Sequence, residues 1–169
     1  MEDHVLIQFG YAVGCIAVGA EWWAYHLHCG LKFRRWSAIA AILWALQYLC
    51  LGAITAAVNM ALTALRTLLS GVLERSVHKN LAALVFCLLF AILTSVSWQE
   101  WSSLLPAFAV INTTLAQFYL GNRAMRISLL FSSLAWISND LIWQAWPALL
   151  AETVAILINL RSIARMRSD

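Results

Sequence analysis

The chain has 169 residues, of which 63% are hydrophobic and 11% are charged. A soluble domain is about half apolar and about a quarter charged, so the composition excludes an ordinary soluble domain and indicates an integral membrane protein. The formal net charge of +3 does not indicate a nucleic-acid partner. The Lys and Arg residues form short clusters between hydrophobic stretches, whereas nucleic acid would require a basic stripe on one folded face.

The first hydrophobic stretch, residues 5–27, is expected to be a retained helix. The residues before it include Glu2 and Asp3 and no Lys or Arg. Because the start of a signal peptide is basic, this sequence does not favour a cleaved signal.

The stretch from Ser37 to Leu65 contains no Asp, Glu, Lys or Arg. As one helix its 29 residues would extend about 43 Å, whereas the hydrocarbon core of a bilayer is about 30 Å thick. We therefore predict two helices, 35–51 and 54–70, with a tight turn near Gly52.

The rest of the chain predicts four more helices. Residues 80–98 and 102–120 each have the length and composition of one span. A second hairpin, with helices 126–142 and 147–164, would turn near Gln144 to Pro147, since proline suits the first turn of a helix. The predicted fold is all-α, a polytopic protein with seven transmembrane helices in a single membrane domain, residues 1–169.

The basic residues predict the orientation, because cytoplasmic loops are enriched in Lys and Arg. With seven helices, all of them lie on one side, in four groups: Lys32, Arg34 and Arg35; Arg66, Arg75 and Lys79; Arg123 and Arg126; and Arg161, Arg165 and Arg167. The N-terminus is then outside and the C-terminus inside. Asp140 is expected to be a charge on the outer side.

The two halves of the chain resemble each other at a nearly fixed spacing. An offset of 92 pairs Arg34 with Arg126, Trp44 with Trp136, and Gln47 with Asn139, and an offset of 95 then pairs Arg66 with Arg161. We predict internal repeats of approximately 5–70 and 102–166, with a linker helix of approximately 80–98. Because three helices per repeat is an odd number, the linker gives both three-helix bundles the same orientation, in a parallel 3+1+3 arrangement.

Several sequence segments resemble the Imp-YgjV family of bacterial inner-membrane proteins. They are Arg35-Trp36-Ser37, Leu49-Cys50-Leu51-Gly52, Asn59 with Ala64-Leu65-Arg66, Met125-Arg126, Trp136-Ile137-Ser138-Asn139, Glu152, and the run from Asn159 to Met166. The resemblance covers most of the chain. It implies a multi-pass protein of the bacterial inner membrane, here with a periplasmic N-terminus and a cytoplasmic C-terminus, but it implies no particular biochemical activity.

The 3+1+3 arrangement is similar to that of the SWEET and PnuC-type facilitators. The resemblance implies a substrate held by a Trp on the second helix and an Asn on the third helix of each half. Trp44, Trp136 and Asn59 fit this pattern, but the repeat equivalent of Asn59 is Val154, and the nearest polar residue is Glu152. The Pro-Gln pair of PQ-loop transporters is absent, which puts sugar specificity and the usual hinge in doubt.

Ionisable residues inside a membrane are costly and indicate function by default. Glu152 could bind a cationic substrate group or a coupled proton, or it could be hydrated near the outer interface. Glu21 could form a gate with a basic residue, or an interfacial salt bridge. His26 and His28 are two residues apart and do not share a helix face, so no metal site is predicted. No catalytic motif or cofactor motif is present either.

Two pairs of an indole and an amide could form a substrate site. Trp44 and Gln47 are three residues apart on one helix, as are Trp136 and Asn139 on another, so each pair shares a face. Two such faces would bind a small polar molecule with a ring. Asn59 and Asn112 could help to orient it, or all these amides could join helices. Trp side chains that faced lipid would remove the site.

The sequence therefore predicts a transporter and not an enzyme. It would be a facilitator or proton-coupled carrier for a small-molecule substrate, a low-molecular-weight polar metabolite such as a sugar, nucleoside or vitamin. The alternative is a non-transporting scaffold, accessory subunit or sensor. The sequence leaves a homo-oligomer open.

Overall fold

The computed structural model describes residues 2–27, 29–73 and 77–165, and the regular structure in these ranges is helical. Seven α-helices lie within them, as predicted, together with one short 3-10 helix. They are α1 (Glu2–His26), α2 (Gly30–Cys50), α3 (Ile54–Leu73), α4 (Lys79–Val96), η1 (Trp101–Ser103), α5 (Leu104–Tyr119), α6 (Asn122–Ile142) and α7 (Trp146–Arg165).

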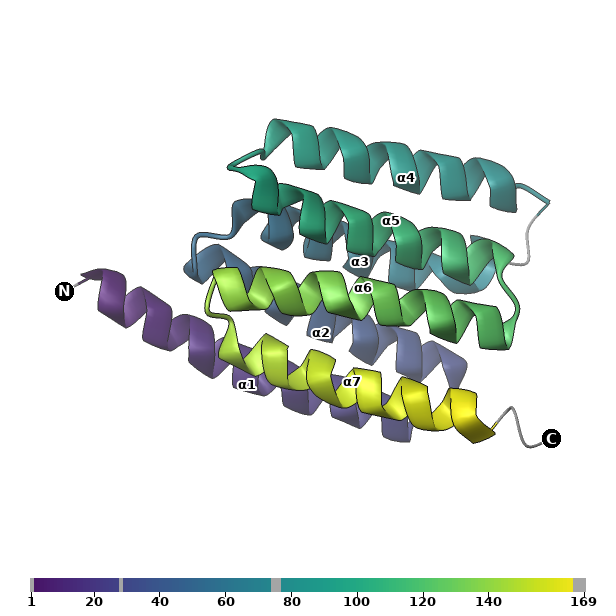
Figure 1. Ribbon diagram of the computed structural model, residues 1–169, viewed down its shortest axis with the longest axis horizontal. Helices are drawn as coiled ribbons and strands as arrows, with labels where there is room; N and C mark the ends of the chain where they lie inside the picture. Colours follow the sequence, from purple (N-terminus) through teal and green to yellow (C-terminus); the bar gives the residue numbers. More distant parts are fainter. Residues whose placement is uncertain (1, 28, 74–76, 166–169) are drawn as a thin grey trace.

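The helices lie side by side along one axis, and helices that follow each other in the chain run antiparallel (Figure 1). The C-terminus and the ends of α1, α3 and α5 lie at one end of the molecule (right in Figure 1). We call this end the basic end. Lys32, Lys79 and Arg126 belong to helices that begin there. At the opposite end lie the N-terminus and the turns that follow α2 and α6. Arg75 and Arg167 lie outside the described residues.

Both predicted hairpin turns are present. Gly52 adopts a φ of 80° between α2 and α3, and Gln144 adopts a φ of 53° between α6 and α7. Glycine favours this left-handed backbone because it has no Cβ. The turns return the chain after helices of 21 residues, so neither of these two hydrophobic stretches forms one long helix.

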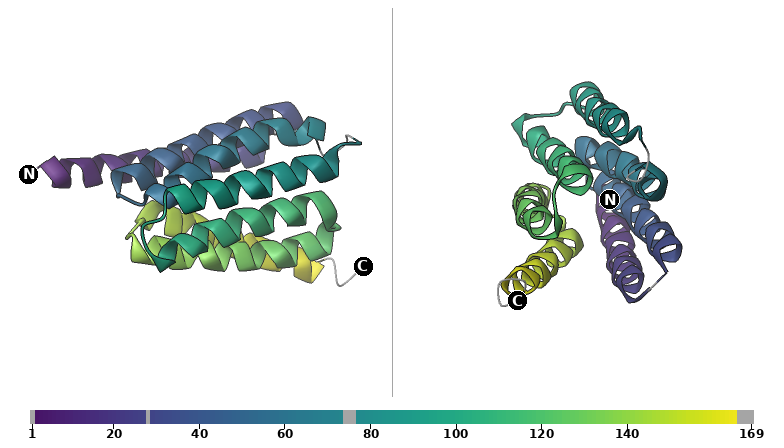
Figure 2. Two further views of the ribbon diagram at one scale, coloured as in Figure 1. Left: turned by 90° about the horizontal axis from the view of Figure 1, so that it is seen from above. Right: turned by 90° about the vertical axis from the view of Figure 1, so that its right-hand side faces the viewer.

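The helices form two sets with α4 beside them. In the first set α1 contacts α2 and α2 contacts α3; in the second set α5 contacts α6 and α6 contacts α7. The sets meet where α1 contacts α7 and where α3 contacts α5, while α4 contacts both α3 and α5. The end-on view in Figure 2 shows the first set in purple and blue and the second in green and yellow.

Small residues form much of the contact between helices. Completely or almost completely buried alanines include Ala17, Ala56, Ala109, Ala135 and Ala145. Small side chains let helix backbones approach closely, which is the common packing mode when lipid removes the hydrophobic drive for association.

Large apolar side chains cover the outside of the molecule, whereas many buried side chains are polar. Each helix has at least one large apolar side chain that is about half exposed. Examples, one per helix, are Ile16, Leu49, Leu68, Leu88, Phe108, Leu134 and Leu157. The buried polar side chains include Gln47, Asn59, Arg66, Asn139 and Asp140. This distribution is the reverse of the one found in soluble proteins.

Length and hydropathy alone identify three candidate membrane spans among the described residues: His4–Ala24, Lys79–Val96 and Trp146–Arg165. A shorter apolar helix covers Ile54–Ser70. Of the remaining helices, α5 has only 16 residues, and α2 and α6 contain several charged and polar residues. In α6 several of these are buried: Ser132 is 3% exposed, Asn139 1% and Asp140 0%.

Two charged residues are more buried than the sequence predicts. Asp140 lies beside the turn between α6 and α7, as expected, but its side chain is completely buried. The last turn of α6 directs its carboxyl group towards α2, where Tyr48 binds it. The sequence predicts that Arg66 belongs to a basic group near a loop. It lies seven residues before the end of α3 and is 3% exposed.

Candidate functional site

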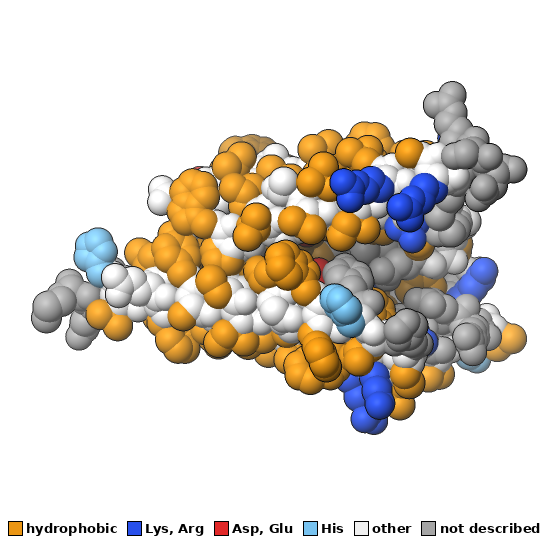
Figure 3. All heavy atoms as spheres, turned by 90° about the horizontal axis from the view of Figure 1, so that it is seen from below, with side chains coloured by type: hydrophobic (Ala, Val, Ile, Leu, Met, Phe, Trp, Pro, Cys, Tyr) orange, Lys and Arg blue, Asp and Glu red, His pale blue; other side chains and the backbone are white. Residues whose placement is uncertain are grey.

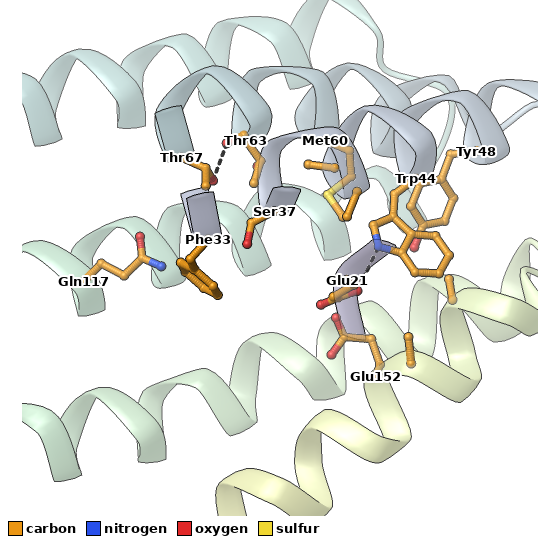
Figure 4. A pocket seen from close by; sticks show the side chains of 14 residues that line it. Glu21, Phe33, Ser37, Trp44, Tyr48, Met60, Thr63, Thr67, Gln117 and Glu152 are labelled. Atoms are coloured by element: carbon orange, nitrogen blue, oxygen red, sulfur yellow. Dashed lines mark hydrogen bonds between the residues drawn. The ribbon is translucent and has the colours of Figure 1, made fainter. Parts of the chain in front are cut away.

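A cavity of about 250 Å³ lies between the two helix sets, and we call it the carboxylate cavity. It takes its name from Glu21 of α1 and Glu152 of α7, which point towards one another across it (Figure 4). The other labelled side chains come from α2, α3 and α5: Phe33, Ser37, Trp44, Tyr48, Met60, Thr63, Thr67 and Gln117. Both helix sets therefore contribute to one cavity.

Trp44 fixes one carboxylate of this cavity. Its indole Nε1–H donates a hydrogen bond of 3.0 Å to Oε2 of Glu21, and its side chain is 4% exposed. The bond joins α2 to α1, so the indole and the carboxylate hold each other in place. A hydrogen bond to an ionised acceptor is stronger than one between neutral groups.

A second space of about 260 Å³, the adjoining cavity, shares Glu21, Glu152, Met60, Thr63 and Gln117 with the first. Its lining adds side chains from α3, α5, α6 and α7, among them Arg66, Thr113, Ser133, Trp136 and Asn159. The two indoles singled out from the sequence thus lie on connected cavities, and both side chains are buried, at 4% and 7% exposure.

Arg66 places a positive charge beside the adjoining cavity. Its Nη1 donates to Oγ1 of Thr114 at 2.6 Å and to the carbonyl of Val110 at 3.4 Å. Its guanidinium carbon lies 5.9 Å from the centre of the Phe90 ring. These contacts direct the guanidinium towards α4 and α5, and Arg66 does not line the carboxylate cavity.

Two further spaces lead from the cavity towards the basic end. One, of about 300 Å³, is lined by Arg34, Ser70 and Met125, and shares Phe33, Thr67 and Gln117 with the carboxylate cavity. The other is a groove of about 730 Å³ between α1, α6 and α7 that begins at Glu21 and Ala151 and includes His26 and Arg126. We call it the α1–α7 groove.

The opposite end of the cavity is closed by a buried polar cluster that we call the polar seal. The Tyr48 hydroxyl donates a hydrogen bond of 2.6 Å to Oδ1 of Asp140. The Tyr48 ring stacks on Trp136, with ring centres 5.7 Å apart and planes 18° apart. Gln47 and Asn139 complete the cluster at 0% and 1% exposure. The seal joins α2 of the first helix set to α6 of the second.

The Imp-YgjV family, described as bacterial inner membrane protein, has a family model that matches residues 8–169 of this chain. The chain belongs to the Imp-YgjV family. The resemblance found in the sequence is thereby confirmed, and so is the inner membrane as the location that the family describes. No curated protein and no solved structure matches the chain.

In this Imp-YgjV protein, the residues predicted for the site separate into three groups. Trp44, Trp136, Glu21 and Glu152 line the connected cavities. Gln47 and Asn139 belong to the polar seal, beyond the end of the cavity. The third group, Asn59 and Asn112, lies between neighbouring helices.

Asn59 and Asn112 make hydrogen bonds that join helices. The Asn59 amide nitrogen donates to the carbonyl of Thr55 at 2.9 Å and to Oγ1 of Thr94, on α4, at 3.1 Å. Asn112 of α5 donates to the Ser128 carbonyl and to the Ser132 hydroxyl of α6, both at 2.8 Å. These contacts match the alternative role of joining helices, which the sequence left open for these amides.

The sequence reasoning missed the seal pair, Tyr48 and Asp140. A signal for it was present, because the two residues are 92 positions apart, which is the offset that pairs Trp44 with Trp136. Tyrosine and aspartate do not look alike, so a search for identical or chemically similar letters passes over them. Their hydrogen bond connects equivalent positions of the two halves.

Proposed function

We propose that this protein is a membrane carrier for a small molecule and that its substrate site is the carboxylate cavity. The observation that carries the proposal is the cavity's position between two helix sets, open towards one end and sealed at the other. Sites of carriers built from repeats lie at the repeat interface, and rocking of one half against the other exposes them to each side in turn. The substrate is a low-molecular-weight polar metabolite.

All seven helices cross the membrane in this proposal. The apolar side chains exposed on every helix support it, since they would otherwise face water. So does the burial of the polar side chains that lower the hydropathy of α6. The shortest helix, α5, has 16 residues, about 24 Å, and η1 extends it at the outer end.

The basic end faces the cytoplasm in this proposal, and the sealed end faces the periplasm. The support is the positive-inside rule together with the gathering of Lys and Arg at one end of the molecule (Figure 3). The helix sets are then parallel three-helix bundles with α4 as their linker, and the cavity opens inwards.

The polar seal is the outer gate of this carrier. Both amide atoms of Gln47 and Oδ2 of Asp140 are buried and have no hydrogen-bond partner among the described residues. A buried polar atom without a partner costs about 1–3 kcal/mol. Opening the seal would let water reach these atoms, so the cost falls in the open state. Such a cluster can therefore alternate between closed and open forms.

Glu21 and Glu152 carry the coupling in this proposal, by binding a proton or a positive group of the substrate. Ionised side chains at membrane depth mark substrate and proton pathways. The protein needs no cofactor for this role and performs no chemical reaction.

A thermal-shift screen of the purified protein against sugars, nucleosides, vitamins and amines tests the proposal. A ligand that binds the folded state raises the melting temperature by mass action. We expect a hit that Glu152→Gln or Trp44→Phe weakens and that Trp101→Phe, at an 80% exposed position, leaves unchanged. A folded protein that responds to no compound would instead support a scaffold, accessory subunit or sensor.

A further inference from the structure

We propose that the ligand of the carboxylate cavity is an amphiphilic organic cation. Its positive head binds between Glu21 and Glu152, and its apolar part lies in the α1–α7 groove. The inference narrows the proposed carrier function to one substrate class and rests on that function.

The head site combines two carboxylates with aromatic walls. Glu21 and Glu152 approach the cavity from α1 and α7, and the rings of Phe33, Trp44 and Tyr48 line the α2 side (Figure 4). A quaternary or protonated amine is attracted both to carboxylates and to aromatic faces. The indole N–H of Trp44 is already bonded to Glu21, so Trp44 offers the ligand its ring rather than its donor.

Charge balance favours a cation over a neutral metabolite. The carboxylate cavity is lined by two Glu side chains and by no Lys or Arg among the described residues. Arg66 lines the adjoining cavity, where Thr114 and Val110 bind its guanidinium. Carboxylates attract a positive group more strongly than a neutral one, and the aromatic walls of the same cavity also attract a cation.

The groove beside the head site supplies an apolar compartment of about 730 Å³. It continues directly from Glu21 and Ala151, and its walls include Trp22, Leu129, Val154 and Ile158. Viewed from the α1 and α7 side, part of an acidic side chain is visible between the two helices (Figure 3). A ligand with a charged head and an apolar part fits this sequence of a carboxylate site and an apolar groove.

Among the described residues that line the groove, one is an Arg, and it lies towards the basic end. Arg126 Nη1 donates to Oδ1 of Asn159 at 3.1 Å. Asn159 is seven residues beyond Glu152 on α7, which is about 10 Å along a helix. The guanidinium is therefore held towards the basic end, one to two turns away from the head site.

Three probes that share a head or a tail test the inference: hexyltrimethylammonium, tetramethylammonium and hexyl glucoside. Binding to the full-length protein in nanodiscs is measured by calorimetry. We expect hexyltrimethylammonium to bind at least about tenfold more tightly than either of the others, because each of them lacks one half of the interaction. Equal affinity for hexyltrimethylammonium and hexyl glucoside would overturn the cation class.

Matched variants separate the head from the tail. Glu152→Gln should weaken hexyltrimethylammonium at least about tenfold and leave hexyl glucoside unchanged, with Glu100→Gln, at an exposed carboxylate, as the control. Val154→Trp should fill the groove and weaken hexyltrimethylammonium but not tetramethylammonium, with the exposed neighbour Thr153→Trp as the control. Glu152→Asp keeps the charge and should retain binding if Glu152→Gln fails to fold.

The carrier and its substrate class can fail separately. If glucose or uridine binds in a Trp44-dependent manner and the ammonium probes do not bind, the carrier function is supported and the cationic substrate class is overturned. Specific binding of hexyltrimethylammonium without exchange of the labelled compound in reconstituted vesicles would keep the cation site and overturn the carrier. A folded protein that binds none of these compounds would overturn both.

Discussion

The two ends of the interface between the helix sets differ in how tightly they are packed. At the sealed end, the hydrogen bond from Tyr48 to Asp140 and the stack of Tyr48 on Trp136 join α2 to α6 through buried side chains. At the basic end, the same helix sets are separated by connected cavities lined by Glu21 and Glu152. One interface thus has polar contacts between the helix sets at one end and cavities at the other, which is the asymmetry that the proposed carrier requires.

Filling the sealed end should have the largest effect. A Cβ on Gly14 would overlap the Gln47 side chain and would lie 2.9 Å from Cβ of Pro147. We expect Gly14→Val to destabilise the protein by about 3 kcal/mol, the upper part of the range for overpacking, and to lower its melting temperature in detergent.

Gly19→Ala, on the same helix, is the control for this substitution. A Cβ at Gly19 meets nothing within 4 Å, and alanine favours a helix more than glycine does. We expect no loss of stability. If Gly14→Val is as stable as Gly19→Ala, the sealed end is not tightly packed and the comparison fails.

Removing the seal's central hydrogen bond should have a smaller effect on stability. Tyr48→Phe keeps the ring that stacks on Trp136 but removes the 2.6 Å hydrogen bond to the buried Asp140 carboxyl group, which then has only the 3.5 Å bond from Asn139, at a cost of about 1–3 kcal/mol. The measurement is again the melting temperature. The control is Tyr11→Phe, which removes a hydroxyl that donates to the Gln144 carbonyl in an exposed setting. If both variants lower the melting temperature equally, the seal has no special role in stability.

A change in the open cavity should affect stability least and ligand binding most. Trp44→Phe removes the donor to Glu21, a net loss of about 1 kcal/mol, because Glu21 lines a cavity in which water could take the place of the indole N–H. Ligand affinity should fall more than stability does. Two quantities are measured: the melting temperature without ligand, and the shift of the melting temperature that the ligand causes. A variant with a much lower melting temperature but an unchanged ligand-induced shift would contradict this prediction.

The sequence predicted the helices well because their limits follow from length, charge and turn chemistry. The charge-free run from Ser37 to Leu65 is too long for one span, and Gly52 supplies the left-handed turn that divides it. The facing of Trp44 and Trp136 into the interior also follows from the paired positions. The membrane topology and the internal repeats remain predictions.

The partners of the buried polar residues could not be predicted in the same way. The direction of Asn59 and Asn112 depends on which neighbour offers a hydroxyl or carbonyl group, and the sequence does not specify helix neighbours. Asp140 was expected outside because it precedes a turn, but the last turn of α6 directs its side chain to Tyr48. A charge near a helix end is therefore ambiguous until the face that it occupies is known.

The most direct test of the account is the accessibility of a cavity residue from each side of the membrane. Thr63→Cys, in a background without Cys15, Cys29, Cys50 and Cys87, places a thiol in the carboxylate cavity. A membrane-impermeant maleimide should label it from the cytoplasmic side and not from the periplasmic side, and Tyr48→Phe should add periplasmic labelling. Thr153→Cys, at an exposed position of α7 that faces lipid in the proposed topology, should stay unlabelled from both sides. Two results would contradict a carrier that opens inwards behind an outer polar seal. One is a Thr63→Cys protein that is not labelled from the cytoplasm. The other is labelling from the periplasm that Tyr48→Phe does not change.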